Sequence, residues 1–512
     1  MQDWTSGYVA DIGYTYGYYS ELNPLRSRLA LIHAGFRPAQ TGVHCELGFG
    51  QGLSINVHSA AGDAVWYGTD FNPSQAAHAQ ELARACDNGA CLYEQSFEEF
   101  CQRTDLPEFD SIGLHGIWSW INDKNRSVIV DFVRRKLKVG GVLHISYNTQ
   151  PGWAAMVPMR ELLTVHASRM GSEGGGIVAK IDAALDFASQ LLEAKPTFAK
   201  SNPQIAERLS KIKEQNRNYL AHEYFNRDWH PMSFAAMSEW LTPAKMDFAC
   251  SANYLDAVDA INLTQAQIKL LNEIKDPLIR QMSRDFCVNQ QFRKDYWIKG
   301  MRTLNAYEQA TCFRNTHVML SVARSEVNLK VNTSIGQANL SAPVYEPILD
   351  LLADHLPYTL GEIEQKLSKQ GIKIPQIVQA VMVLCGMQAL CEVQEETVQA
   401  SAQKNTAKLN KHLLDKAKSS ADISYLASPV TGGGIAVGRF AQLFMLAREN
   451  GHRTPQSCAQ ATWEILAQQN QRLIKEGKLI ENANDNLKEL TSQALNFDDK
   501  HLPVLKALKI AL

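Results

Sequence analysis

Glu46-Leu-Gly-Phe-Gly-Gln-Gly52 is the stretch that decides the fold of this 512-residue chain. It follows the run 43–47, which is typical of a short buried strand, and it precedes a helix from about Leu53. Glycines let the backbone turn tightly here and approach a ligand without an intervening side chain. The third glycine comes one residue too early for the dinucleotide pattern, and an acid before the loop would repel a pyrophosphate. The stretch therefore favours a ligand that carries an ammonium and a sulfonium, with a bare turn as the alternative.

Strands and helices alternate after this loop. Further strands are predicted at 64–70, 109–113 and 141–147, and helices at 74–86 and 125–137. Alternation at this spacing predicts a parallel sheet covered by helices on both faces.

Three further features follow in order along the same segment. Asp70 ends the second strand, where a carboxylate can accept two hydrogen bonds from ribose hydroxyls. Gln95 comes at the end of a predicted third strand, where its side chain and backbone could face an adenine. Leu137-Lys-Val-Gly-Gly141 is typical of a helix end, a tight turn and the next strand.

Residues 40–147 together resemble the class I S-adenosylmethionine-dependent methyltransferases. The resemblance implies a Rossmann-like sheet that binds S-adenosylmethionine and releases S-adenosylhomocysteine. Many members carry Asp at the adenine turn, where this chain has Gln95. The cofactor-binding residues that we expect are Glu46, Gly48, Gly50, Gly52, Asp70, Phe71, Gln95, Ser96, Phe97 and Tyr18.

A narrower resemblance extends over most of the chain in pieces. Residues 14–20, 146–153, 219–229, 284–295 and 426–434 resemble segments of bacterial methyltransferases with a regulatory domain. This group includes the rickettsial protein-lysine methyltransferases of outer-membrane proteins. The resemblance implies transfer to lysine amines of a protein, with an outer-membrane or surface protein as one candidate substrate. Transfer to a small molecule, a glycan or RNA is an alternative, and so is a non-catalytic cofactor-binding sensor or scaffold.

The part of the active site that binds the methyl acceptor must align a neutral lysine amine with the methyl donor. Burial in an apolar channel lowers the pKa of a lysine, and aromatic faces tolerate a methylated ammonium. Active sites of open α/β sheets lie at the carboxyl ends of the strands, so residues after the fourth and fifth strands are candidates. The catalytic candidates are Tyr147, Trp118, His115 and Asn148, and the substrate-binding candidates are Trp120, Trp153 and Tyr14. Structural packing is the alternative for each aromatic side chain and for His115. The tyrosine cluster 14–19 could cover the cofactor as a lid.

The chain is long enough for two or three domains. We expect a cofactor-binding core over 1–165, a helical insertion and regulatory region over 166–325 that completes the sheet, and a mostly helical, winged-helix-like region over 326–512. Residues 400–420 are predicted to form a solvated helix or linker. The third helix of the winged-helix outline, 375–388, contains no Lys or Arg, so DNA binding is not expected.

Composition limits the partners, the location and the metal sites that we expect for this protein. The net charge is −2, which gives no whole-chain reason for a nucleic-acid partner. No apolar run reaches the roughly 18 residues of a membrane span, and no secretory signal is recognised at the start. Ten cysteines lack metal-site spacing, which predicts reduced thiols, a cytoplasmic location and no metal site. The oligomeric state stays open, with a homodimer as one option.

Overall fold

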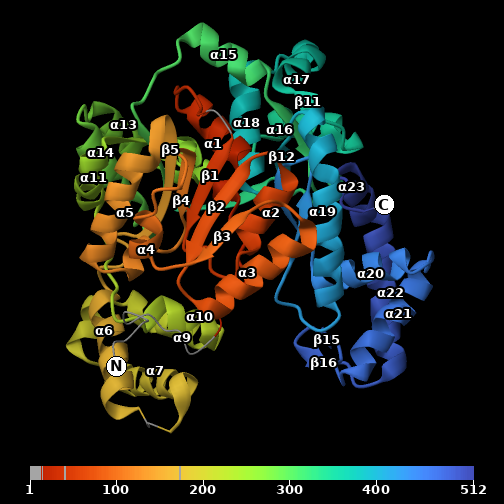
Figure 1. Ribbon diagram of the computed structural model, residues 1–512, viewed down its shortest axis with the longest axis horizontal. Helices are drawn as coiled ribbons and strands as arrows, with labels where there is room; N and C mark the ends of the chain where they lie inside the picture. The colour runs from red at the N-terminus through yellow and green to blue at the C-terminus, as the bar shows by residue number, and fades with distance from the viewer. Residues whose placement is uncertain (1–12, 14, 40–41, 172–173, 512) are drawn as a thin grey trace.

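The structure, a computed structural model, describes residues 13, 15–39, 42–171 and 174–511. Its centre is a seven-stranded sheet of order β3-β2-β1-β4-β5-β7-β6 (Figure 1). Five neighbouring strands are parallel, namely β1 (Val43–Leu47), β2 (Val65–Asp70), β3 (Cys91–Glu94), β4 (Phe109–Leu114) and β5 (Leu137–Asn148). The predicted α/β sheet is confirmed, with β1 at the residues expected.

Helices cover the parallel part of the sheet, as the alternation predicts. They are α2 (Leu53–Ala61), α3 (Pro73–Cys86), α4 (Phe97–Cys101) and α5 (Asp123–Lys136). Local sequence sets where they begin: the Asn72 side chain accepts from the Ser74 and Gln75 amides to start α3, and Asn122 caps α5. Both faces of the inner strands are buried, since His44, Cys45, Glu46 and Leu47 of β1 are all buried in succession.

A helical insertion separates β5 from the last two strands of the sheet. Five helices run from α6 (Val157–Met170) through α7 (Gly176–Glu193), α8 (Thr197–Ser201) and α9 (Gln204–Lys213) to α10 (Arg217–Tyr224). They share an apolar core that includes Leu163, Ile181 and Leu220. After α11 (Phe234–Leu241), β6 (Met246–Ser251) adds at the edge and β7 (Phe292–Lys299) pairs antiparallel with both β5 and β6. The helices α13 (Gln265–Glu273) and α14 (Pro277–Val288) lie between these two strands in the chain.

The winged-helix outline is present in the C-terminal region. A three-stranded sheet of order β11-β8-β12 combines Tyr358–Thr359, His317–Leu320 and Leu390–Glu392 with α16 (Ala342–Leu351), α17 (Leu360–Lys366) and α18 (Ile374–Gly386). The Thr359–Glu362 capping box starts α17. Most of α18 is buried, so it forms part of a core.

The prediction for residues 400–420 is wrong in part. They belong to α19 (Glu396–Ala417), whose Leu409 and Leu413 share a buried core with Val57 of α2 and Leu82 of α3. This helix therefore fixes the C-terminal region against the part of the chain that forms the parallel strands, beside α2 and α3 (Figure 1). The hairpin β13 (Tyr425–Ser428) and β14 (Gly433–Ala436) and the helices α20 (Arg439–Glu449), α21 (Pro455–Gln468), α22 (Ala483–Asn496) and α23 (Leu502–Ala507) follow it.

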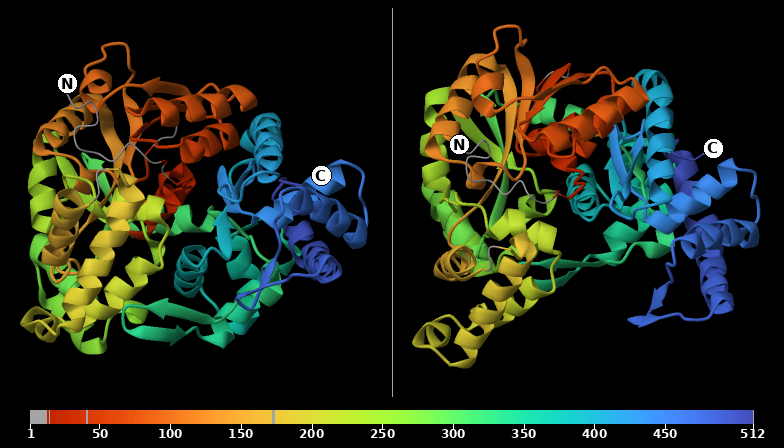
Figure 2. Two further views of the ribbon diagram at one scale, coloured as in Figure 1. Left: turned by 90° about the horizontal axis from the view of Figure 1, so that it is seen from below. Right: turned by 60° about the horizontal axis from the view of Figure 1, so that its bottom comes forward.

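The insertion and the C-terminal helices occupy opposite ends of the molecule (Figure 2). Within the described ranges, no helix has the length and hydropathy that crossing a bilayer requires. Nor do three or more His, Cys, Asp or Glu side chains of those ranges gather as a metal-binding group.

Candidate active site

A cavity of about 290 Å³ lies at the carboxyl ends of β1, β2 and β4. The chain runs outward from β1 to β2 and β3 and then returns to place β4 on the other side of β1. Such a reversal opens a crevice where ligands of open α/β sheets bind. Segments that follow all three strands line it, together with residues 15–19 and part of the insertion.

The glycine loop forms one wall of this cavity. Gly48, Gly50 and Gly52 all have left-handed backbone angles, with φ of 75°, 57° and 72°. A Cβ on Gly48 would lie 2.6 Å from the Ile117 side chain, and one on Gly52 would lie 2.2 Å from Cβ of Ala79. Backbone conformation and close packing both therefore require glycine here.

Asp70 lies beside the loop with its carboxylate held by two backbone amides. Gly50 N–H donates to Oδ2 and Asn72 N–H donates to Oδ1, both at 2.9 Å. Each oxygen keeps a further lone pair for a ligand hydroxyl. Burial raises the pKa of Asp70 to about 6, so the group is still mostly ionised at neutral pH.

Gln95 offers a buried acceptor at the other end of the same wall. Its backbone is fixed because its N–H donates to Asp70 O at 3.2 Å and its carbonyl accepts from Thr69 Oγ1 at 2.5 Å. Its Oε1 is buried and finds no donor in the described part of the chain. A buried acceptor without a donor costs free energy that a ligand amine would recover, which fits the exocyclic amine of adenine. Phe71, Ser96 and Phe97 line the cavity beside it.

Glu46 takes a different place from the one expected. Its side chain is buried behind the loop and does not line the cavity. Burial and the nearby charge of Asp70 raise the pKa of Glu46 to about 8. It is therefore mostly protonated at neutral pH and supplies little charge to a ligand.

The acceptor candidates divide into two groups. His115 and Trp120 line the cavity, whereas Trp118, Tyr147, Asn148 and Trp153 do not. The indole N–H of Trp118 donates to the Met232 sulfur at 3.3 Å, and Trp153 packs edge-on against Trp229. Trp118 and Trp153 are thus packed inside the protein, Asn148 is buried, and Tyr14 lies outside the described residues.

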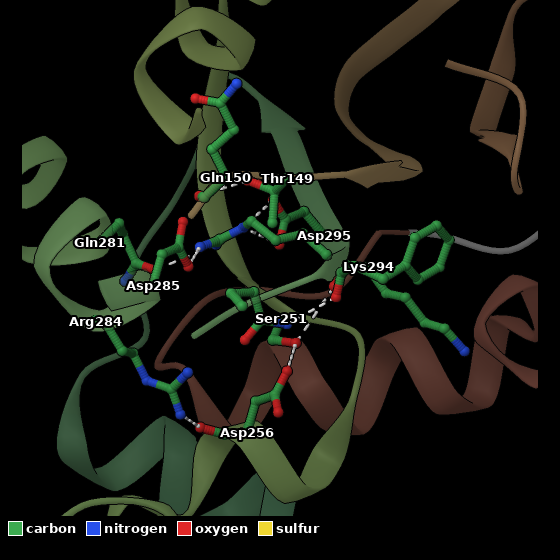
Figure 3. A network of polar contacts seen from close by, with 12 residues as sticks. Thr149, Gln150, Ser251, Asp256, Gln281, Arg284, Asp285, Lys294 and Asp295 are labelled. Atoms are coloured by element: carbon green, nitrogen blue, oxygen red, sulfur yellow. Dashed lines mark hydrogen bonds and ion pairs between the residues drawn. The ribbon is translucent and has the colours of Figure 1, made fainter. Parts of the chain in front are cut away.

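Tyr147 belongs to a buried polar network that joins β5 to β7. Its hydroxyl donates to Asp295 at 3.0 Å, and Arg293 forms ion pairs with Asp295 at 2.9 Å and Asp285 at 2.6 Å. Figure 3 shows Asp285 and Asp295 within this network, with Thr149 and Gln150 near them. The network fixes the carboxyl end of β5.

The inserted helices supply a wall that the sequence did not reveal. His222 and Glu223 of α10 and the nearby Asp228 line the cavity. Among the described lining residues, Asp70, Glu98, Glu223 and Asp228 are acidic, and Lys124 is the sole Lys or Arg. Lys124 forms an ion pair with Glu98 at 2.6 Å, and Arg227 outside the lining forms one with Asp228 at 3.6 Å. The lining residues themselves carry more acidic than basic groups, so their net sign suits a cation.

His115 lies at the junction of the two walls. Its ring stacks on Tyr19 with the ring centroids 3.7 Å apart. Burial lowers the pKa of His115 to about 3, so the ring is neutral at physiological pH. Its Nδ1 is buried and has no hydrogen-bond partner among the described residues.

The fold matches a solved structure over nearly its whole length. PKMT2 from Rickettsia typhi, in complex with AdoHcy, superposes with a TM-score of 0.68 over 94% of this chain and 98% of that chain, at 14% identity. A second structure of PKMT2 gives a TM-score of 0.67 at 15% identity. The chain thus has the fold of the S-adenosylmethionine-dependent methyltransferases, as predicted.

Sequence comparison then gives the family. Residues 216–299 match the family described as "Predicted methyltransferase regulatory domain". The uncharacterized protein sll1526 of Synechocystis sp. is 40% identical over 513 residues, which cover 99% of this chain and all of that protein. The chain belongs to one family with this protein. The uncharacterized protein RP789 of Rickettsia prowazekii is 26% identical over 48% of this chain and 44% of its own length.

Proposed function

We propose that this protein transfers methyl groups from S-adenosylmethionine to lysine side chains of a protein substrate. The observation that carries the proposal is one cavity with two different walls. One wall has the glycine loop, Asp70 and Gln95, and the other has His115, Trp120 and the acidic residues of the insertion. Bound S-adenosylmethionine supplies an electrophilic methyl carbon on a sulfonium.

The cofactor wall would bind by complementary hydrogen bonds and charge. The Asp70 carboxylate accepts from ribose hydroxyls, and Gln95 Oε1 accepts from the adenine amine. The glycine loop lets the amino-acid part approach the backbone. The ionised Asp70 carboxylate also favours the ammonium and sulfonium charges.

The acceptor wall would desolvate and orient a lysine amine. Glu223 and Asp228 attract the ammonium towards the cavity. The apolar surfaces of Ile117, Trp120 and Ile121 then lower the lysine pKa from its reference of about 10.4, so that the proton is lost to water. The neutral His115 ring accepts a hydrogen bond from the amine at Nδ1 and does not repel it.

The finer parts of the proposal rest on resemblance to the rickettsial enzymes. We propose a cytoplasmic enzyme whose substrate is an outer-membrane or surface protein, and a homodimer as its oligomeric state. The buried position of α18 supports a protein substrate over DNA.

Labelled methyl transfer to a lysate tests the function. Purified protein is incubated with radiolabelled S-adenosylmethionine and a lysate from cells that lack the enzyme, and lysines are examined by mass spectrometry. We expect new methyl-lysine with the wild type and a large loss with His115→Ala, measured at saturating S-adenosylmethionine because His115 also stacks on Tyr19 of the cavity lining. Label in RNA, glycans or small molecules alone would contradict lysine transfer. Failure to bind S-adenosylhomocysteine in calorimetry would contradict the cofactor assignment.

A further inference from the structure

A short N-terminal segment, residues 15–19, lies between the cavity and the C-terminal region; we call it the cover segment. Its alternate residues Thr15, Gly17 and Tyr19 line the cavity. The intervening Tyr16 and Tyr18 pack against the apolar core that the C-terminal region shares with α2 and α3. An extended backbone places successive side chains on opposite sides, so one segment contacts both regions at once.

The cavity side of the cover segment is held mainly through Tyr19. Its N–H donates to Ser54 Oγ at 3.2 Å, and its carbonyl accepts from His58 Nε2 at 3.1 Å. Its ring stacks on His115, and a Cβ on Gly17 would lie 2.3 Å from its hydroxyl. The Tyr19 ring therefore covers its own segment and reaches the junction of the two cavity walls.

The other side is held by the hairpin β13–β14. The Tyr18 ring lies 5.0 Å from the Tyr425 ring and 5.1 Å from the His58 ring. Just after the segment, the Asn23 side-chain amide donates to the carbonyl of Thr431 at 3.0 Å in a buried hydrogen bond. The C-terminal hairpin and the cofactor-binding core thus meet at Tyr18.

Gly433 and Gly434 make this contact feasible. Neither has a positive φ, so conformational freedom does not explain them. A Cβ on Gly433 would lie 2.3 Å from the Tyr18 hydroxyl, and one on Gly434 would lie 3.0 Å from the Tyr18 ring. Gly433 and Gly434 are therefore required by the close approach of Tyr18, which comes from the other end of the chain.

We infer that Gly433 and Gly434 are positioning residues of the cofactor site, acting through Tyr18 on the cover segment. The C-terminal hairpin seats Tyr18, and this fixes Thr15, Gly17 and Tyr19 over the cavity. Only the expected loss of cofactor affinity depends on the proposed function. The contact between Tyr18 and the two glycines should also slow hydrogen–deuterium exchange of the cover segment in the cofactor-free protein.

Gly433→Ala in the full-length protein tests the inference. We expect S-adenosylhomocysteine to bind at least tenfold more weakly in calorimetry. We also expect hydrogen–deuterium exchange of residues 15–23 to be faster in the cofactor-free protein. Gly438→Ala is the matched control, because Gly438 in the same region has open space around its Cβ position and an ordinary φ of −65°. This control should bind and exchange like the wild type.

A second substitution separates this contact from general damage to the hairpin. Without the Tyr18 hydroxyl, the nearest Tyr18 atom to the added Cβ would be Cζ at 3.5 Å, an ordinary contact, whereas the Asn23 side-chain nitrogen would stay 2.8 Å away, so the recovery is expected to be partial. Tyr18→Phe combined with Gly433→Ala should therefore recover at least part of the lost affinity and protection. No recovery would overturn the inference, as would wild-type binding and exchange in Gly433→Ala alone.

If Gly433→Ala does not fold, Asn23→Asp is a second variant that tests the same contact between the cover segment and the hairpin. It keeps the Oδ1 acceptor that caps α1 (Pro24–His33) through the Leu25 amide but places an acceptor against Thr431 O. We expect binding to weaken several-fold and exchange of residues 15–23 to rise; wild-type values would overturn the inference. If the wild type binds no S-adenosylhomocysteine, the proposed function fails, whereas exchange in the cofactor-free protein still decides whether the contact holds the cover segment.

Discussion

The two walls of the cavity are built in different ways. The cofactor wall comes from consecutive strand ends between Gly48 and Phe97, and backbone conformation fixes it. The acceptor wall combines the end of β4 with side chains of α10, more than 100 residues later in the chain. The insertion that carries α10 has its own apolar core. The acceptor wall can therefore change without disturbing the sheet, whereas the cofactor wall cannot.

The largest expected effect is confined to the cofactor wall. Asp70→Ala removes a charge-assisted acceptor, which corresponds to a loss of about 1.5–3 kcal/mol, or roughly 10- to 150-fold in Kd. Calorimetry with S-adenosylhomocysteine measures it. Glu223→Gln on the other wall should leave this Kd unchanged. If the two substitutions raised the Kd for S-adenosylhomocysteine equally, the assignment of the two walls to different ligands would be wrong.

Acid should weaken cofactor binding through the same carboxylate. Because the pKa of Asp70 is about 6, the group is ionised at pH 7.5 and largely protonated at pH 5. Protonation removes the anionic acceptor, so Kd should rise about tenfold over this range. The Asp70→Asn variant should show a flat profile between these pH values. A wild-type profile that is equally flat would remove Asp70 from the site.

A smaller effect is expected from the acidic residues of the acceptor wall. Glu223→Gln combined with Asp228→Asn should lower kcat/KM for a lysine peptide about fivefold, since partly exposed charge pairs contribute about 0.2–1 kcal/mol each. The loss should shrink at high salt, and the Kd for S-adenosylhomocysteine should stay the same. Glu207→Gln, an exposed acid of the same insertion, is the control. A changed cofactor Kd in the double variant would show that the walls are not independent.

The smallest effect concerns Glu46. Its pKa is raised in the folded protein to about 8, so the folded state retains a proton that the unfolded state has lost. Stability should therefore fall as pH rises from 5 to 8.5. Glu46→Gln removes this dependence and should raise Tm by about 2–4 °C at pH 8.5 relative to the wild type. Parallel pH profiles of Tm for the two proteins would contradict the assigned pKa.

Most of the residues predicted to bind the cofactor line the cavity, although Glu46 and Tyr18 do not, whereas most of the acceptor candidates do not line it. The Gly48–Gly52 loop, Asp70, Phe71 and the residues 95–97 all line the cavity, because strand alternation and the next turn determine their positions locally. Trp118 and Trp120 lie in one short helical turn, yet only Trp120 faces the cavity. Which tryptophan faces the cavity depends on tertiary packing against Met232 and the insertion, and the local sequence gives no signal for it.

The same limit applies to Tyr18 and to the C-terminal hairpin. The tyrosine cluster predicts a cover over the cofactor, and Thr15, Gly17 and Tyr19 do line the cavity. Tyr18 faces away because alternate residues of an extended segment point to opposite sides. Its partner glycines are about 415 residues away, a separation over which a single sequence gives no signal.

The late position of β7 has a consequence for biosynthesis. β5 ends at Asn148, but its antiparallel neighbour begins only at Phe292. A nascent chain therefore exposes the unpaired edge of β5 to the cell while the intervening residues are still being translated. Unpaired strand edges promote aggregation, and pairings of high sequence separation form slowly. Chains that stop before residue 292 should accumulate as insoluble material, even though they contain the whole cofactor wall.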